Sequence, residues 1–286
     1  MKKILVIGSS NVDYTLEIEN FPKKGETIHS KNFFKSVGGK GLNQAIAASI
    51  ISDNVTFLTA LGNDLDKDYI LSFLSNYNIN LCPIIKDTNT GSAIIELDRT
   101  GDNKIIVNGG ANMCLSKKDI DDNLELIKSS DIIILQLEID LDTISHIIEL
   151  GNKYGKTIIL NPSPFKKLDY RNLDYLIVNE GELEMVLDDK ELSFLFDKSN
   201  IKNVIVTLGD KGAKIINKDG EKIIAGNKVK AIDTVGAGDC FTGVFAGCLA
   251  NDYDIDKCLS TSNLAASKSV TKKGAAISYP KRNEII

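Results

Sequence analysis

The stretch "DIIILQLE", residues 131–138, decides the fold class because it contains an unbroken aliphatic run from Ile132 to Leu135. A strand with one face in water alternates apolar and polar residues, whereas a strand buried on both faces is almost continuously apolar. The stretch therefore indicates a strand inside a sheet that is covered on both sides. Glu138 follows the strand and would lie at the carboxyl edge of that sheet, where α/β proteins bind ligands.

Further runs of this kind recur along the chain, and longer segments with helical apolar spacing lie between them. The runs are "KILVIG" (3–8), "VTFLTALG" (55–62), "KTIILNP" (156–162), "DYLIVNE" (174–180) and "NVIVTLG" (203–209). Strand and helix in alternation predict an open, mostly parallel α/β sheet. Because no repeat or linker interrupts the pattern, we expect one domain spanning residues 1–286.

Two segments depart from this rhythm and show alternation with hairpin turns instead. They are residues 13–36 and residues 91–107, the second of which contains the turn "LDRTGDNKI". Such segments predict a small antiparallel sheet that projects from the main body. We expect it to act as a lid over a ligand site.

Composition narrows the class of partner. The formal net charge is -5 with a pI of about 5.3, and acidic and basic residues are interspersed, which argues against a nucleic-acid partner. The cysteines form no CxxC pair, and no apolar run approaches the roughly 18 residues of a membrane span. "MKK" leads directly into "ILVIG", which is too short for a secretion signal. We expect a soluble, cytoplasmic protein with a small-molecule partner and no membrane partner.

The stretch "DTVGAGDCF", residues 233–241, combines residues with minimal side chains, an acid and the start of an apolar helix. The first N–H groups of a helix have no partner within the helix and carry partial positive charge, so a bare entrance can hold an anionic phosphate. Asp239 would be placed to accept a proton from a hydroxyl that attacks this phosphate. A helix cap is the alternative role for Asp239.

A second glycine-rich turn, "SVGGKGLNQA" (36–45), brings backbone amides, the Lys40 ammonium and the Asn43 amide to one place. A solvated surface role for Lys40 is the alternative. The segment is not the G-x-x-x-x-G-K-[ST] loop of P-loop proteins, and "GSSN" (8–11) is not the G-x-G-x-x-G dinucleotide fingerprint.

Taken together, the motifs identify a family. In order they are "GSSNVD", "GGKGLNQA", "NEGE", "TLGDKG" and "DTVGAGD", and "NGGANMCLS" and "VTKKGAAISYP" add to them. On these residues the chain resembles the PfkB (ribokinase-like) carbohydrate kinase family nearly end to end, most closely its ribokinase branch. The resemblance implies a three-layer α/β/α fold with an antiparallel β lid, and ATP-dependent transfer of the γ-phosphoryl group to the 5-hydroxyl of D-ribose, a pentose sugar.

The resemblance also implies residue roles. Asp239 would be the catalytic base, and Gly236, Ala237 and Gly238 would form the anion hole. The sugar-binding positions would be Asn11, Asp13, Gly39, Lys40, Gly41, Asn43 and Glu138, together with Asp239. The ATP-binding positions would be Asn179, Thr207, Gly209, Gly212, Gly238 and Asn263.

The resemblance further implies two bound cations and a homodimer. Glu182 would act on Mg²⁺ through water, and a monovalent cation, usually K⁺, would lie beside the anion hole. The positions that match this cation site are Asp233, Val235, Ser269, Lys272, Gly274 and Ser278. Local turn capping by Asp233 and Ser278 is the alternative. Family members pair through their lids, which implies a homodimer here.

Other functions remain open at this stage. Within the family, the substrate could instead be deoxyribose, a nucleoside or a sugar phosphate, although Lys23, Lys24, Lys31 and Lys35 form no obvious phosphate clamp. A catalytically silent sugar-binding module would bind sugar without releasing ADP. A nicotinamide-dependent oxidoreductase would need the dinucleotide fingerprint that the sequence lacks.

Overall fold

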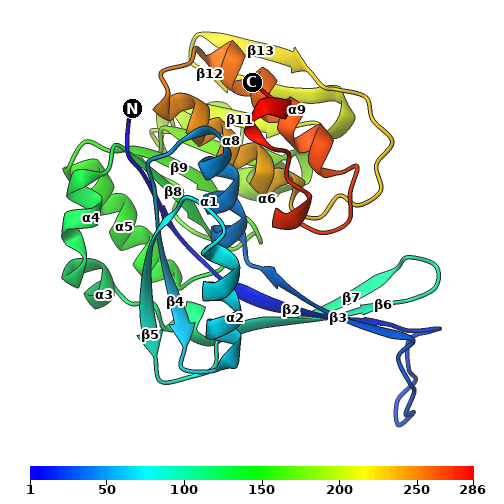
Figure 1. The fold of residues 1–286 in the computed structure, drawn as a ribbon. Helices are drawn as coiled ribbons and strands as arrows, with labels where there is room; N and C mark the ends of the chain where they lie inside the picture. Colours follow the sequence, from blue (N-terminus) through cyan, green and yellow to red (C-terminus); the bar gives the residue numbers. More distant parts are fainter.

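The computed structural model describes residues 1–286 and is built around a nine-stranded sheet (Figure 1). From edge to edge the strands are β13 (Gly220–Ala225), β12 (Gly212–Asn217), β11 (Asn203–Thr207), β10 (Tyr175–Asn179), β9 (Thr157–Asn161), β8 (Ile132–Gln136), β1 (Ile4–Ile7), β4 (Val55–Gly62) and β5 (Asn80–Lys86). All neighbours from β11 to β5 pair in parallel, and only β12 and β13 pair antiparallel. The prediction of a mostly parallel α/β sheet is confirmed.

Alternate residues of each central strand enter two different cores. In β8, Ile132 and Ile134 pack on one side of the sheet, and Ile133 and Leu135 pack on the other. The first core is covered by α1 (Lys40–Ile51), α2 (Leu65–Leu74), α8 (Ala237–Ala250) and α9 (Ile255–Ser269). The second is covered by α3 (Lys117–Asp122), α4 (Leu124–Ser129), α5 (Leu141–Lys153), α6 (Glu180–Leu187) and α7 (Ser193–Asp197). This burial on both faces explains the continuous aliphatic runs.

No helix combines the length and the apolar character that a membrane span requires. Four short 3-10 helices complete the helical elements: η1 (Gly110–Cys114), η2 (Gly209–Lys211), η3 (Ala276–Ser278) and η4 (Arg282–Glu284).

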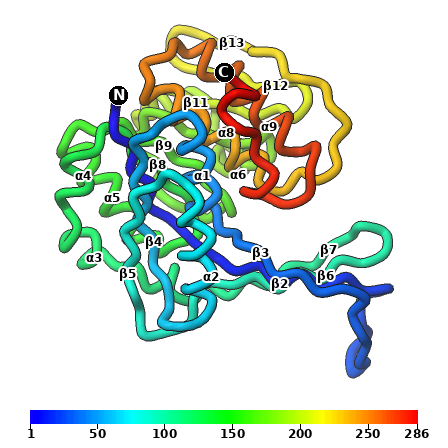
Figure 2. The backbone as a smooth tube through the Cα atoms, in the orientation of Figure 1, coloured from blue at the N-terminus to red at the C-terminus, as the bar shows by residue number.

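A second, four-stranded sheet projects from the body as a lid (Figure 2). Its strands are β3 (Asn32–Gly38), β2 (Asn11–Glu17), β6 (Gly91–Leu97) and β7 (Asn103–Asn108), in that order across the sheet. The hairpin pairs β2–β3 and β6–β7 are antiparallel, as predicted, whereas the central β2–β6 pair is parallel. That pairing arises because β2 and β6 follow β1 and β5, two strands that run in the same direction in the large sheet, and so leave it in the same direction.

The helices α1 and α8 pack unusually closely on the first face. An added Cβ at Gly243 of α8 would lie 2.4 Å from the carbonyl oxygen of Gln44 in α1, so only glycine permits this approach. The approach brings the entrances of the two helices together at the carboxyl edge of the sheet, so the two glycine-rich turns of the sequence meet there.

Candidate active site

Asp239 is the third residue of α8, and its carboxylate is held by two amides of α1. Its Oδ2 accepts a hydrogen bond from Asn43 Nδ2 at 3.1 Å, and its Oδ1 accepts one from Gln44 Nε2 at 2.9 Å. The residue at the N-cap of α8 is Gly236, and no side chain caps that helix. The capping alternative for Asp239 is therefore wrong, and the carboxylate belongs to the junction between α1 and α8.

The turn before Asp239 presents unpaired amides. The backbone N–H groups of Gly238 and Asp239 donate to no protein atom, whereas that of Ala237 donates to the Thr234 carbonyl at 3.3 Å. An added Cβ at Gly238 would meet nothing within 4 Å. Free donors, empty space and the positive end of a helix dipole are the conditions that favour an anion.

Gly236 fixes the shape of this turn. It adopts a left-handed conformation with φ of 75°, which favours glycine, and its carbonyl accepts a hydrogen bond from the Tyr279 hydroxyl at 2.9 Å. Burial raises the pKa of the Tyr279 phenol well above its ordinary value, and the nearby Asp239 charge adds to that effect. The phenol therefore remains protonated and can donate. Its hydrogen bond to the Gly236 carbonyl stabilises the turn at the start of α8.

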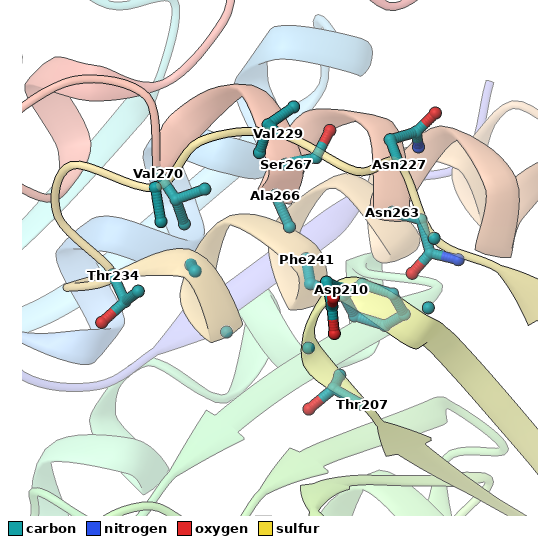
Figure 3. A pocket seen from close by; sticks show the side chains of 16 residues that line it. Thr207, Asp210, Asn227, Val229, Thr234, Phe241, Asn263, Ala266, Ser267 and Val270 are labelled. Carbon is teal, nitrogen blue, oxygen red and sulfur yellow. The ribbon is translucent and has the colours of Figure 1, made fainter.

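A cavity of about 260 Å³ opens beside the same turn (Figure 3). Ala237 and Gly238 line one part of it, and the apolar side chains of Val229, Phe241 and Val270 line another. Of the sequence-predicted ATP-binding residues, those that line the cavity are Thr207, Gly209, Gly212, Gly238 and Asn263. Asn179 does not line it. The cavity thus joins the carboxyl end of β11 to the free amides of α8.

The residues predicted to bind sugar gather around the entrance of α1. Glu138 Oε2 accepts hydrogen bonds from Ser9 Oγ at 2.5 Å and from the Lys40 amide at 3.0 Å, so this carboxylate ties β8 to the first turn of α1. Asn11 is buried at the start of β2, and its Oδ1 accepts a hydrogen bond from Asn112 Nδ2 at 2.8 Å. Gly39 and Gly41 flank Lys40 in the same turn.

Charges at this entrance perturb one another. Attraction to Asp239, and then to Glu138 and Glu182, raises the pKa of Lys40 despite its burial. Burial, with repulsion from Glu138, raises the pKa of Asp13 to about 6. Lys40 is half-buried and lies in the field of these carboxylates, which does not fit a purely solvated role, and Asp13 carries a carboxyl group that makes no hydrogen bond within the protein.

Asn179 and Glu182 form a capping box at the start of α6. Asn179 Oδ1 accepts from the Glu182 amide at 2.8 Å, and Glu182 Oε2 accepts from the Asn179 amide at 2.9 Å. The second carboxylate oxygen of Glu182 remains free, and this residue contributes to the field at Lys40. A free carboxylate oxygen is a suitable partner for Mg²⁺, which retains part of its water shell in proteins and can be met through water.

The predicted monovalent-cation residues lie in two loops that Asp233 joins. Asp233 Oδ1 accepts from the Val235 amide at 3.0 Å, and its Oδ2 accepts from the Gly274 amide at 2.8 Å. Ser278 Oγ donates to the Ala275 carbonyl, and the Ser269 carbonyl accepts from the Lys272 amide. The turn-capping alternative thus describes the hydrogen bonds of Asp233 and Ser278.

The carbonyls of Val235, Lys272 and Gly274 accept no hydrogen bond from the protein. Free carbonyl oxygens beside one carboxylate form a donor set that fits a hard monovalent cation. Within the chain, no group of three or more His, Cys, Asp and Glu side chains forms a cluster suited to a transition metal.

Sequence reasoning missed four residues that shape this site: Ser9, Gln44, Asn112 and Tyr279. Each lies inside a motif that the sequence analysis quoted, but none carries a charge that would draw attention to it. Gln44 was detectable in principle, since a glutamine among the apolar residues of a helix needs a buried partner.

Comparison with known proteins gives one consistent result. The family model described as "pfkB family carbohydrate kinase" matches residues 1–282. A deoxyribokinase of Salmonella typhi is 37% identical over 292 residues, covering 97% of this chain and 95% of that protein. A ribokinase structure from Thermotoga maritima superposes with a TM-score of 0.90 at 37% identity, covering 100% and 98%. An Arabidopsis thaliana ribokinase complexed with ribose and ATP gives a TM-score of 0.88 at 30% identity, covering 99% and 97%.

Proposed function

This chain belongs to the pfkB family of carbohydrate kinases, which are phosphotransferases with an alcohol acceptor, and from that premise we propose that it transfers the γ-phosphoryl group of ATP to the 5-hydroxyl of D-ribose. One observation carries the proposal. The Asp239 carboxylate lies in the same helical turn as the free amides of Gly238 and Asp239, beside a cavity of about 260 Å³. The Asp239 carboxylate, which can accept a proton, therefore lies next to the free amides, which can bind a phosphoryl group.

In this proposal Asp239 accepts the proton of the sugar's primary hydroxyl as that oxygen attacks the γ-phosphorus. The bond between the γ-phosphorus and the β,γ-bridging oxygen breaks, and ADP leaves with the bond's electron pair. The turn formed by Gly236, Ala237 and Gly238 presents the free amides of Gly238 and Asp239 to the charge that the transferring group carries, which is the electrostatic role of an anion hole. Lys40 supplies positive charge between the sugar and the phosphoryl group.

The sugar site follows from the residues at the entrance of α1 and at the root of the lid. Asp13, Asn11 and Asn43 provide carboxylate and amide groups that can bind neighbouring hydroxyls in pairs. An unmet buried polar group costs about 1 to 3 kcal/mol, so a sugar that lacks one hydroxyl binds less well. The Arabidopsis relative complexed with ribose and ATP supports ribose, and the Salmonella relative makes deoxyribose the first competitor to test.

The nucleotide would occupy the cavity with its base toward Val229 and Val270 and its phosphates toward Gly238. Thr207, Gly209, Gly212 and Asn263 line the remaining wall, and Asn179 lies outside it, so we assign Asn179 only a capping role. Mg²⁺, which supplies charge neutralisation for the phosphates, would be met through water by Glu182.

A monovalent cation, K⁺ by family resemblance, would be held by Asp233, by the Val235, Ser269, Lys272 and Gly274 carbonyls and by the Ser278 hydroxyl. Three of those carbonyls accept no hydrogen bond from the protein, which supports this assignment. The residues brace the loop that precedes Gly236. A stimulation of turnover by K⁺ over a bulky organic cation would test it.

A homodimer formed through the lid is the proposed assembly. The lid exposes large apolar side chains: Phe33, Phe34, Ile94, Ile105, Ile106 and Val107. Exposed apolar side chains concentrated on one small sheet favour an interface there. Light scattering at micromolar concentration should give twice the chain mass of 31.2 kDa, and a monomeric mass would contradict the proposal. The requirement for ATP fits a cytoplasmic enzyme.

The experiment that tests the function is an ADP-release assay with MgATP over D-ribose, 2-deoxyribose, hexoses, nucleosides and sugar phosphates, with and without K⁺. We expect the highest kcat/KM with D-ribose. A higher value with another acceptor would reassign the substrate within the family. Sugar binding without ADP release on any acceptor would instead identify a silent binding module.

A further inference from the structure

Gln44 contacts Asp239 but belongs to neither the expected sugar site nor the expected nucleotide site. Its Nε2 donates to Asp239 Oδ1 at 2.9 Å and to Asn161 Oδ1 at 3.2 Å, and its Oε1 accepts from Gln136 Nε2 at 2.7 Å. Gln44 is fully buried, and Gln136 is 1% exposed. All three of these hydrogen bonds of the Gln44 amide are therefore made to buried protein groups, one of which is the candidate base.

The orientation of this amide follows from one backbone group. Asn161 Nδ2 donates to the Ile177 carbonyl at 2.9 Å, and a carbonyl can only accept. Asn161 must therefore turn its oxygen toward Gln44, and Gln44 must turn its NH₂ group toward Asn161 and Asp239. A continuous set of hydrogen bonds thus connects the Ile177 carbonyl in β10 with the Asp239 carboxylate in α8.

The opposite orientation is excluded from the other side as well. If the Gln44 amide were reversed, its oxygen would face both the Asp239 carboxylate and the Asn161 oxygen, and three acceptors would meet without a proton. Gln136 matches the orientation that Asn161 sets, because its NH₂ group donates to the Gln44 oxygen. The cost falls on Gln136, whose Oε1 is buried without a partner and lies where a Cβ at Gly8 would sit.

The network fixes the orientation of the Asp239 carboxylate but leaves it able to accept a proton. Asn43 holds Oδ2 and Gln44 holds Oδ1, so each oxygen has one amide donor and keeps lone-pair capacity. A base whose carboxylate cannot rotate reaches an attacking hydroxyl in one geometry, and a misplacement of about 1 Å can cost on the order of a hundredfold in rate.

We propose that Gln44 is a positioning residue for Asp239, fixed in orientation by Asn161 and supported by Gln136, and that it sets the direction in which the base faces the acceptor hydroxyl. The inference rests on the proposed role of Asp239 as the base. It assigns Gln44 no contact with sugar or nucleotide, so its loss should alter turnover and leave binding intact.

The first test compares Gln44→Met with wild type. Methionine fills a similar volume without donating, so kcat should fall about 10-fold to 100-fold while KM for sugar and for ATP changes less than about twofold. Gln136→Met should show a smaller loss, because it removes a donor to the Gln44 oxygen and leaves Asn161, which orients the amide, in place. The matched control is Thr143→Val, which loses a buried hydrogen bond to the Leu115 carbonyl on the other face of the sheet and should keep wild-type kcat.

A double-mutant cycle separates positioning from general stability. In the Asp239→Asn background, Gln44→Met should cause little further loss, because the group through which it acts is already disabled. An equal loss of kcat in both backgrounds would overturn the proposal. If Gln44→Met does not fold, Gln44→Leu, which also removes the donor with a similar volume, is measured in the same cycle with the same expectation.

A readout independent of activity distinguishes this inference from the proposed function. Crystal structures of wild type and Gln44→Met should show the Asp239 carboxylate rotated away from its place between α1 and α8 in the variant. An unchanged Asp239 position would overturn the positioning role even if the enzyme is a kinase. Absence of kinase activity in the wild type, with Asp239 displaced in the variant, would overturn only the proposed function.

Discussion

The two regions that must meet around the sugar, the entrance of α8 and the lid, are held in different ways. At the entrance, amides from α1 hold Asp239 and the Tyr279 hydroxyl holds the turn before it. On the lid, Asp13 carries a carboxyl group without a protein partner, and large apolar side chains face solvent. The chemistry is therefore preorganised on the body, whereas the lid carries groups that are satisfied only when something binds.

The lid is attached to the first turn of α2 at the end nearest the body, which we call the root of the lid. The Tyr14 hydroxyl donates to the two oxygens of Asp66 at 2.6 and 2.7 Å, and the Lys35 ammonium binds the same carboxylate at 2.8 Å. Asp64 accepts from the amide and hydroxyl of Thr90 just before β6. Both hairpins of the lid are thus fixed at one end only. Substitutions at the entrance should change turnover, and substitutions in the lid should change sugar binding.

The largest effect is expected for Asp239→Asn. Loss of the base should lower kcat about 100-fold to 10,000-fold, because general-base catalysis contributes roughly that factor. The amide can still bind Asn43 and Gln44 in part, so the melting temperature should stay within a few degrees. Steady-state kinetics with thermal unfolding of the same samples would test this. Normal turnover in the variant would remove Asp239 from its role.

Gly238→Ala should have the next largest effect. The new methyl group meets no protein atom within 4 Å, and alanine is the better helix former, so stability should not fall. The methyl group would occupy the space beside the free amides and displace the phosphoryl group, lowering kcat/KM on the order of 10-fold to 100-fold.

Gly236→Ala is the informative companion to that variant. Its φ of 75° and a Cβ only 2.7 Å from the Ala275 Cβ should destabilise the fold by about 1 to 3 kcal/mol. Chemical denaturation gives the free energy of unfolding of both variants. It therefore shows whether the glycine is needed for folding, as expected at Gly236, or only for ligand binding, as expected at Gly238. A destabilised Gly238→Ala protein would contradict the distinction.

On the lid side, sugar binding should depend on pH through Asp13. The pKa of about 6 means that this carboxyl is protonated in the free protein below about pH 6, so KM for sugar should rise by about tenfold per pH unit from there. Asp13→Asn should raise KM at pH 7 and abolish this dependence. A wild-type KM that stays constant between pH 7 and 5 would contradict the assignment.

The same shift predicts the sign of a stability change. The raised pKa gives the native state a preference for the protonated form that is fully present below the ordinary value of 3.8 and is lost as pH rises through about 6. At pH 7 the buried charge is therefore a cost. Asp13→Asn should raise the free energy of unfolding there by about 1 to 3 kcal/mol.

The smallest effect is expected at the root of the lid. Asp66→Asn weakens the bonds to Tyr14 and Lys35, which are partly exposed, so KM for sugar should rise about threefold to tenfold with kcat nearly unchanged. Asp68→Asn, in the same helix turn but paired only with Lys67 at 3.5 Å on the surface, is the matched control. Equal kinetics for both variants would show that the root does not set the lid's position.

The same contrast explains what the sequence could predict. The central strands were identified because burial on both faces leaves continuous aliphatic runs, as in β8 and β11. The edge strands β5 and β13, and β12 beside β13, were not identified, because their exposed or half-buried residues interrupt any such run. The parallel β2–β6 pair was not predicted either, since pairing between distant segments leaves no local signal.

For the site, the sequence singled out Glu138 as a charge after a buried strand, and Asp239 and Lys40 as charges in glycine-rich turns before helices. The structure brings these three charges near one another. Gln44 and Tyr279 escaped notice, since a neutral side chain reveals its role only through partners far away in sequence. Asn179 was placed in the nucleotide site by its motif, but its hydrogen bonds serve the start of α6.

The most direct test of the central claim is a crystal structure with D-ribose, MgADP and aluminium fluoride, which imitates the transferring phosphoryl group. The account predicts the fluoride group within about 3.2 Å of the Gly238 and Asp239 amides, with the ribose 5-hydroxyl within the same distance of the Asp239 carboxylate. A fluoride group bound elsewhere, or a 5-hydroxyl turned away from Asp239, would contradict it.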